Sequence, residues 1–268
     1  MKSKSLLTLV LSPILLSGTA FAAYTPVGVT GWTEDIVINN PSPYNESVTS
    51  TMDGGYGTPE NNTWIEAGTY TRNEGDEFYF NGLVAGTHTS IGPSGAEFVF
   101  QNFTGNNALL LESGITQTLS LDSLASYSSL VFIGAAAGGG AAEVTVTLHF
   151  SDFTTATFSS PDGIARDWFD SGSTEAAYLV GGRASNKSEE GYTLLFDNNN
   201  DAIRLHEYVV DLALADQSKE LVSIDVTNSG SGGRVALFAV SGEAIPEPSV
   251  ALLSGAALLG LGLRRRRN

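Results

Sequence analysis

The sequence has no cysteine among its 268 residues. No disulfide can therefore hold the fold together, and no cysteine can serve as a nucleophile or a metal ligand. Cysteine usage also does not reveal the redox compartment. A chain of this length can bury a sizeable core without such cross-links, so a globular body is still expected.

Basic residues are scarce, with 13 Lys and Arg against 29 Asp and Glu. Six of the basic residues and one acidic residue lie in two terminal segments that resemble signals. The body between them keeps 7 basic and 28 acidic residues, a net charge of −21. This charge argues against binding to nucleic acid or to anionic lipid through a basic face. It fits a secreted protein that meets neutral sugars or cations, or one whose acidity serves solubility alone.

The common catalytic motifs are also missing. There is no G-x-S-x-G turn, no HExxH helix and no glycine loop placed to hold a phosphate. The histidines His88, His149 and His206 lie far apart and lack metal-ligand spacing, and nothing points to a Ser–His–Asp triad. The sequence therefore predicts that the protein is not an enzyme and needs no cofactor.

No stretch after Tyr24 has helical periodicity, and Gly, Ser, Thr and Asn interrupt short apolar or alternating runs. This pattern predicts an all-β fold, an antiparallel β-sandwich with jelly-roll connections. The expected strands are residues 36–38, 76–80, 97–101, 108–111, 118–121, 130–133, 143–150, 155–158, 192–196, 203–207, 209–214, 221–226 and 235–240.

Two local expectations accompany this fold. The stretch Gly134–Ala142 contains only Gly and Ala, and its three consecutive glycines predict a flexible loop. Val222, Ile224 and Val226 alternate with other residues, so we expect them to share one face of their strand.

The first 22 residues have the pattern of a secretory signal peptide, with a signal helix. Lys2 and Lys4 supply the positive region, Leu6–Leu16 the apolar region and Ala20-Phe21-Ala22 the cleavage site. The mature chain then begins at Ala23 or Tyr24. The alternative is a packed N-terminal helix.

Residues 244–268 have the pattern of a sorting tail. Pro246, Glu247 and Pro248 form an extended polar motif, Val250–Leu263 is apolar, and a cluster of arginines ends the run. The cluster is Arg264, Arg265, Arg266 and Arg267. With Ile245–Pro248 added, the run approaches the roughly 20 residues of a transmembrane helix, and the arginines favour a cytoplasmic end. The alternative is a C-terminal core helix with a solvated basic end.

The motif, the apolar run and the arginines together resemble the PEP-CTERM sorting signal of Gram-negative bacteria. The resemblance implies a membrane-embedded exosortase as partner. It also implies transient inner-membrane anchoring through the tail, followed by release to the cell surface or the extracellular matrix. The same tail is sometimes labelled an ice-binding protein C-terminal domain, which describes the tail alone. Ice binding needs a regular threonine array, and Thr145-x-Thr147 does not repeat along the chain. Ice binding is therefore not predicted.

A second resemblance covers about Phe98 to Gly242. The segments that carry it are Phe103–Leu109, Tyr127–Leu130, Asp167–Phe169, Gly182-Arg183, Leu205–Tyr208 and Phe238–Gly242. Their order is similar to the body of a group of PEP-CTERM proteins whose domain resembles galactose-binding-like β-sandwiches. The body then divides into N-terminal strands at 23–95 and a sandwich domain at 96–243. In the turn after residue 150 this chain has Asp152-Phe153, where the family more often has Asp-Gly, so the turn type stays open.

The best candidate for a ligand site is the acidic stretch around Trp168. A sugar ring can stack on an indole while Asp167, Asp170 and Arg183 exchange hydrogen bonds with its hydroxyls. The alternative is a structural loop in which Trp168 plugs one end of the sandwich and Asp167 caps a turn.

A weaker candidate is a calcium site at Asp197, Asn199 and Asp201, which offer oxygen ligands at alternate positions. It is no EF-hand, because Ala202 stands where the loop glycine belongs. A polar β-turn is the alternative. Galactose-binding-like sandwiches often hold structural calcium, but their ligand loops cannot be located in this sequence.

The sequence thus predicts an exported cell-surface or matrix protein that binds glycans, with polysaccharide as a partner. One alternative is a purely structural biofilm or envelope protein. Another is a secreted polysaccharide hydrolase, which requires two carboxylates about 5–10 Å apart across a cleft.

Overall fold

The structure is a computed structural model that describes residues 23–39, 48–53, 62–71, 77–138, 143–160, 163–185, 195–198 and 202–245. The predicted signal peptide and residues 246–268 lie outside these ranges. Within them the chain is all-β, as the sequence predicts. The one helical element there is a 3-10 turn, η1 (Gly163–Ala165), and no helix in this part of the chain is long and apolar enough to cross a bilayer.

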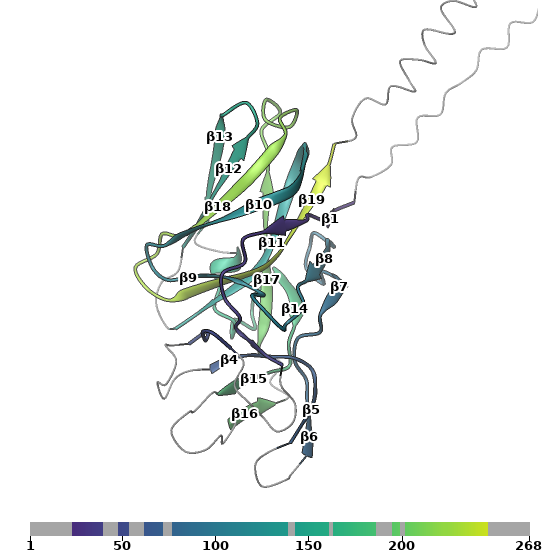
Figure 1. Ribbon diagram of the computed structural model, residues 1–268, viewed down its shortest axis with the longest axis vertical. Helices are drawn as coiled ribbons and strands as arrows, with labels where there is room; N and C mark the ends of the chain where they lie inside the picture. The colour runs from purple at the N-terminus through teal and green to yellow at the C-terminus, as the bar shows by residue number, and fades with distance from the viewer. Residues whose placement is uncertain are drawn as a thin grey trace, which may run out of the picture.

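Two antiparallel sheets form the upper part of the molecule in Figure 1. The strands of sheet A, in spatial order, are β1 (Thr25–Pro26), β19 (Arg234–Ala244), β11 (Tyr127–Ala137), β17 (Arg204–Asp211) and β14 (Ala176–Leu179), and β9 (Leu109–Leu111) also pairs with β19. The strands of sheet B are β13 (Thr155–Ser160), β12 (Val144–Phe150), β18 (Leu221–Asn228), β10 (Thr116–Ala125) and β2 (Val29–Thr30).

Shorter strands form the lower part of the molecule and its flank (Figure 1). A third sheet has the order β16 (Leu195–Asn198), β15 (Gly182–Ser185), β4 (Asn62–Ile65) and β3 (Val37–Ile38). Two separate ladders pair β5 (Gly68–Thr71) with β6 (Glu77–Phe80), and β7 (Gly86–Thr89) with β8 (Glu97–Phe100). Among the strands described here, only the pairing of β3 with β4 is parallel.

The first core lies between sheets A and B. Val144, Val146 and Leu148 of β12 point into it and alternate with half-buried Thr145 and Thr147. Phe132 of β11 is among the residues that sheet A contributes to the same core. Sheet B therefore has one buried and one solvent-facing side, which explains the clean alternation of its sequence.

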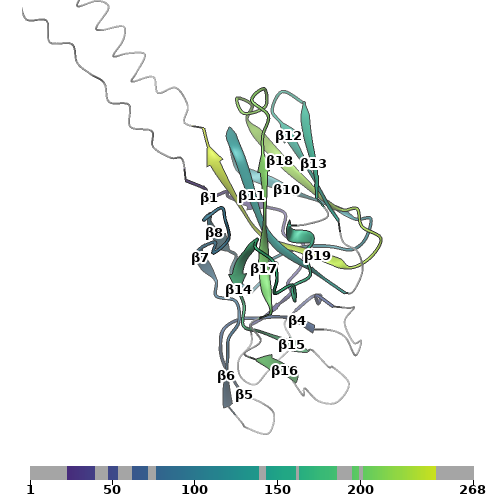
Figure 2. The same ribbon diagram turned by 180° about the vertical axis from the view of Figure 1, so that it is seen from behind.

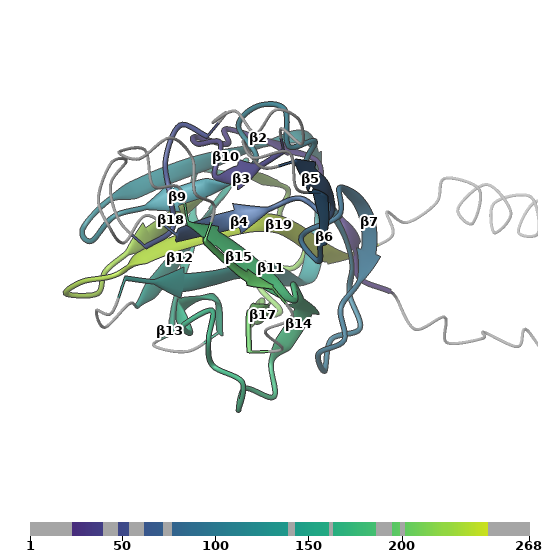
Figure 3. The same cartoon turned by 90° about the horizontal axis from the view of Figure 1, so that it is seen from below.

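Sheet A is buried on both sides. Its second face, with Val131 and Ile133 of β11 and Phe238 of β19, packs on Trp64 and Trp168 in a second core. Figure 3 shows β4 and β15 in front of β11 and β19 when the molecule is seen from below. A strand covered on both faces has no polar side, so β11 and β19 are continuous apolar runs rather than alternating ones.

The glycine- and alanine-rich stretch begins as strand, not as loop. Strand β11 continues through Ala137, and the prediction of a loop from Gly134 was therefore wrong for residues 134–137; Gly139–Ala142 lie outside the described residues. Past a one-residue register shift at Gly134, β11 stays paired with β19 as far as Ala137 and Arg234. A side chain on Gly134 would collide with the carbonyl oxygen of Ala236. Small residues here let two strands pack closely inside the protein.

Two further strand predictions were wrong in detail. The two strands expected at 203–207 and 209–214 are one strand, β17. Val222 does not share the buried face of Ile224 and Val226, since it is exposed while Leu221 is buried. A register shift between β12 and β18 at His149 and Phe150 inserts an extra residue there, which reverses the side-chain alternation.

The segment expected as N-terminal strands contributes to both sheets. Strand β1 pairs with β19 at one edge of sheet A, and β2 pairs with β10 at one edge of sheet B. Residues 23–30 therefore belong to the same sandwich as the later strands.

The outer face of sheet B carries a regular array of hydroxyl groups. Paired positions on neighbouring strands form three rows, Ser159–Thr145–Thr227–Thr116, Thr157–Thr147–Asp225–Thr118 and Thr155–His149–Ser223–Ser120–Thr30. The threonines that form no repeat along the chain are brought side by side with serines across the strands of this face. A hydrogen-bond contact of 2.8 Å between His149 Nε2 and Asp225 Oδ2 interrupts the rows.

Candidate binding site

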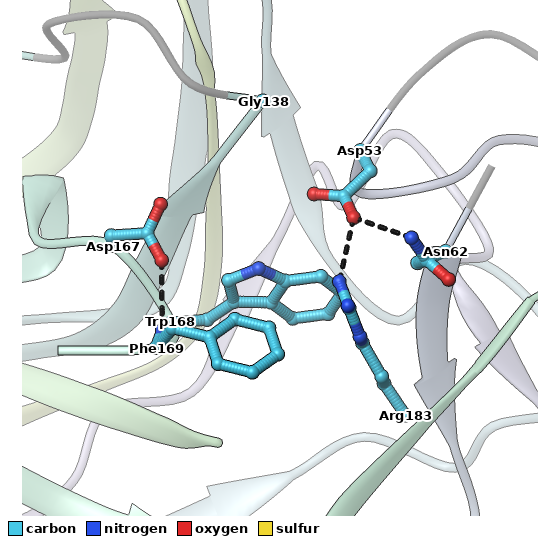
Figure 4. Close-up of a pocket in the computed structure, with 7 residues that line it drawn as sticks. All are labelled: Asp53, Asn62, Gly138, Asp167, Trp168, Phe169 and Arg183. Atoms are coloured by element: carbon cyan, nitrogen blue, oxygen red, sulfur yellow. Dashed lines mark hydrogen bonds and ion pairs between the residues drawn. The ribbon is translucent and has the colours of Figure 1, made fainter. Parts of the chain in front are cut away.

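A polar hollow of about 540 Å³ lies where sheet A meets the third sheet. Its lining comes from five separate segments of the chain, namely the residues before β4, β4 itself, the end of β11, the turn after η1, and β15. The lining residues are Asp53, Asn62, Gly138, Asp167, Trp168, Phe169 and Arg183 (Figure 4). The structure thus brings Asp167, Trp168 and Arg183 together, as the sequence predicts.

Trp168 forms the buried floor of the hollow and is only 1% exposed. Its ring packs edge-to-face on Trp64 with centroids 4.8 Å apart. The backbone holds it in place, since the Trp168 N–H donates to the carbonyl of Ala136 at 2.9 Å and the Arg204 N–H donates to the carbonyl of Trp168 at 3.0 Å. The expected sugar stacking on the Trp168 face therefore needs correction, because the neighbouring side chains already cover that ring.

Phe169 is the aromatic residue that reaches the surface of the hollow. It is half-buried, and its ring meets Trp168 nearly at right angles with centroids 6.0 Å apart. The Arg183 guanidinium carbon lies 4.4 Å from the Phe169 centroid and 5.3 Å from the Trp168 ring. Such a cation–π contact holds both side chains in one geometry.

The two predicted aspartates have different roles. Asp167 is exposed, and its Oδ1 accepts a hydrogen bond from the N–H of Phe169 at 2.8 Å. It therefore fixes the turn that presents Phe169, and it lines the hollow as well. Asp170 is not part of the lining; it forms an ion pair with Arg166, with 3.1 Å between Oδ2 and Nη1.

Sequence reasoning missed Asp53 and Asn62. Asp53 Oδ2 accepts hydrogen bonds from Arg183 Nη1 at 2.9 Å and from Asn62 Nδ2 at 2.8 Å (Figure 4). Asp53 and Arg183 are 130 residues apart, so no local pattern links them. The only sequence signal near Asp53 is the glycine-rich turn that follows it.

Burial raises the pKa of Asp53 above its usual range. The hydrogen bond from Asn62 and the charge of Arg183 act in the opposite direction, and the charge of Asp167 raises it further. Two carboxylates and one guanidinium give the hollow a net charge of −1. The hollow therefore favours a neutral or cationic ligand over an anion.

His206 lies directly behind the hollow and is completely buried. Its ring nitrogens lie 3.0 Å from Ser173 Oγ and 3.1 Å from the carbonyl oxygen of Asp167. Burial lowers its pKa, so the neutral ring is favoured. Its role is to support the Asp167 turn from behind.

The structure does not show the three predicted calcium ligands together. The backbone of Asp197 lies in β16, opposite Arg183, while Asn199 and Asp201 lie outside the described residues. In the described ranges no three or more His, Asp or Glu side chains gather in a way that could hold a metal ion.

Comparison with known proteins gives no matching family model and no matching curated protein. The resemblances of the tail and of the body therefore stay predictions from the sequence.

Proposed function

We propose that this chain is an exported surface or matrix protein whose body binds a neutral glycan in the polar hollow. The N-terminal signal delivers it, and an exosortase-type enzyme sorts it through the tail that includes Pro246, Glu247 and Pro248. The body is proposed to be a jelly-roll sandwich of the galactose-binding-like kind. The tail anchors the precursor in the inner membrane until it is processed.

The observation that carries the glycan proposal is the composition of the hollow. A half-buried ring, Phe169, lies beside a free carboxylate oxygen of Asp167, the amide of Asn62 and the guanidinium of Arg183. Sugar hydroxyls need both donors and acceptors, and the apolar face of a sugar needs an aromatic or aliphatic contact. The hollow offers all three within one surface depression.

Binding fits this geometry better than hydrolysis. Asp53 and Asp167 line the same hollow, which is the observation that favours a hydrolase. However, Asp53 accepts hydrogen bonds from Arg183, Asn62 and the backbone of Gly138. A carboxylate held this way is a structural acceptor, whereas a general acid must keep a proton free to donate.

The test is a glycan array probed with residues 24–245, with and without calcium. Phe169→Ala and Asp167→Asn alter the hollow while leaving the Trp168 floor in place. Phe153→Ala is the matched control, since Phe153 is a second surface phenylalanine at the opposite end of the sandwich. We expect wild-type binding to neutral glycans, a loss of about tenfold or more in Phe169→Ala, as for truncation of a central aromatic contact, and no loss in Phe153→Ala.

Three outcomes would change the proposal. Unchanged binding in Phe169→Ala and Asp167→Asn would exclude the hollow as the site. A blank array from a folded sample would favour the purely structural alternative. Release of new reducing ends from a bound polysaccharide would favour the hydrolase.

A further inference from the structure

The end of the sandwich opposite the hollow exposes large apolar side chains. Phe153, at the tip of the β12–β13 hairpin, is 97% exposed, and Leu214, in the loop between β17 and β18, is 86% exposed. These are the two most exposed large apolar side chains of the described residues. Leu124, near the end of β10, is half exposed at the same end.

The two loops that carry these tips are fastened to each other. The Lys219 ammonium donates to Thr154 Oγ1 and to Asp216 Oδ1, both at 2.8 Å. The N–H of Ser151 donates to the carbonyl of Glu220 at 2.9 Å. Phe153 and Leu214 therefore project from one joined platform and not from two independent loops.

Phe153 occupies a backbone conformation that disfavours its side chain. Its φ is +67°, and among the described residues it is the only non-glycine residue with positive φ. A bulky side chain in this region is unusual, and glycine would adopt it without strain. Asp152 Oδ1 closes the turn by accepting from the N–H of Thr154 at 3.0 Å. The turn thus holds an aromatic ring in water at a position where the fold does not need one.

The C-terminal tail leaves the sandwich at this same end. The N–H of Ile245 donates to the carbonyl of Ser126, in the connection between β10 and β11, at 2.9 Å. In Figures 1 and 2 the end of β19 and the β12–β13 hairpin point to the same side of the molecule. The apolar run starts at Val250, five residues after Ile245, and five extended residues span at most about 17 Å.

We infer that this end of the sandwich contacts the bilayer that the tail spans, with Phe153 and Leu214 inserted at the membrane interface. The inference rests on the proposed membrane-spanning role of the tail and is independent of glycan binding. Apolar side chains on protruding tips fit the boundary between headgroups and acyl chains, where aromatic rings also gather. The short connection keeps Ile245, at the same end of the sandwich as the tips, within about 17 Å of the start of the apolar run. The contact would hold the Pro246–Pro248 motif at the membrane surface.

The charges at this end specify the kind of lipid. Lys219 lies 3.7 Å from Asp152 Oδ2 and 2.8 Å from Asp216 Oδ1, and the neighbouring Glu220 adds a third carboxylate. The local charge is therefore negative, and anionic headgroups would repel it. Insertion must come from the apolar side chains, so neutral lipid is the expected surface.

The test uses the full chain, which has no cysteine and so accepts a single label at a chosen position. Phe153→Cys and Leu214→Cys place an environment-sensitive fluorophore on the two tips. Ser231→Cys places it in the exposed β18–β19 turn, at the other end of the sandwich. Each variant is reconstituted into phosphatidylcholine vesicles with or without spin-labelled lipid. Leu214 does not have the strained φ of Phe153, so a result seen at both positions cannot be caused by a change in backbone strain.

We expect severalfold stronger quenching by spin-labelled lipid at positions 153 and 214 than at 231, and weaker quenching when anionic lipid is added. Equal quenching at all three positions would overturn the inference. Flotation of the vesicles distinguishes a failure of this inference from a failure of the proposed function of the tail. A chain that does not float refutes the spanning tail and the membrane contact together. A chain that floats with unquenched tips refutes the contact alone.

Discussion

The two ends of the sandwich place polar and apolar side chains in opposite ways. At the hollow end, ionisable groups are inside: Asp35, in the segment before β3, is 5% exposed, and His206 is completely buried. At the tail end, apolar groups are outside, with Phe153 and Leu214 almost fully exposed. The difference lies in the partners. Asp35 accepts a hydrogen bond from Asn107 Nδ2 at 2.6 Å, whereas nothing in the described chain covers Phe153.

This contrast shows that the unusual side chains of the two ends are stabilised in different ways. Asp35 and His206, which are buried at the hollow end, both have hydrogen-bond partners, as burial requires. Apolar side chains at the tail end stay in water, so they contribute little to the stability of the fold. They would be stabilised only by burial against another surface. In our proposals, the first end binds a ligand through side chains that the fold already positions, and the second end is covered by a membrane.

The largest expected effect separates the buried floor from the exposed tip. Trp168→Ala should lower the free energy of unfolding by about 3–5 kcal/mol, because it empties a buried site against Trp64. Phe153→Ala should change it by about 0.5 kcal/mol or less, because that ring touches little besides water. Urea unfolding of both variants measures the difference. Similar losses in the two would mean that Phe153 packs within the fold, and the contrast between the ends would fail.

A pH-dependent effect should follow from Asp35. Burial raises its pKa to about 6, against hydrogen bonds from Asn107 and Val37 that lower it. Between pH 4 and 6 the folded state then binds more protons than the unfolded state, so stability falls as pH rises through this range. The loss is roughly 2–3 kcal/mol at 1.36 kcal/mol per pKa unit.

Asp35→Asn keeps the shape and removes this loss. Unfolding at pH 4, 5, 6 and 7 should show the variant gaining on the wild type as pH rises. His206 acts with the opposite sign, since its lowered pKa makes stability rise with pH towards 6.5, but both proteins share it. Parallel curves for the two proteins would show that Asp35 titrates normally.

The smallest effect concerns the strained turn. Phe153→Gly should raise the free energy of unfolding by about 0.5–1 kcal/mol, because glycine relieves the positive φ while making the unfolded chain more flexible. Phe153→Ala keeps the strain and is the matched control. Thermal unfolding measures both, and a less stable glycine variant would show that the turn is not strained.

Local patterns predicted much of this fold. The alternation of Val144, Val146 and Leu148 gave the right strand with the right face inward, because sheet B has one side in water. Strand β19 was also predicted, from its continuous apolar run, because sheet A is covered on both sides. At the hollow, the cluster at Asp167 and Trp168 was found because its members are neighbours in the chain. Which of the two aromatics is accessible could not be found, since burial of Trp168 depends on Trp64, 104 residues earlier.

The sequence by itself determined the all-β class, the acidic surface and the two terminal segments that predict export, because composition and short-range alternation specify these features. The tertiary structure decided everything that needs distant residues to meet. It joined Asp53 to Arg183, aligned hydroxyl groups across sheet B, and extended β11 into a stretch of glycine and alanine. It also placed Phe153 and Leu214 at the end where the tail departs. Side-chain periodicity is local, whereas strand register and layer packing join segments far apart in the chain, and only the folded chain fixes them.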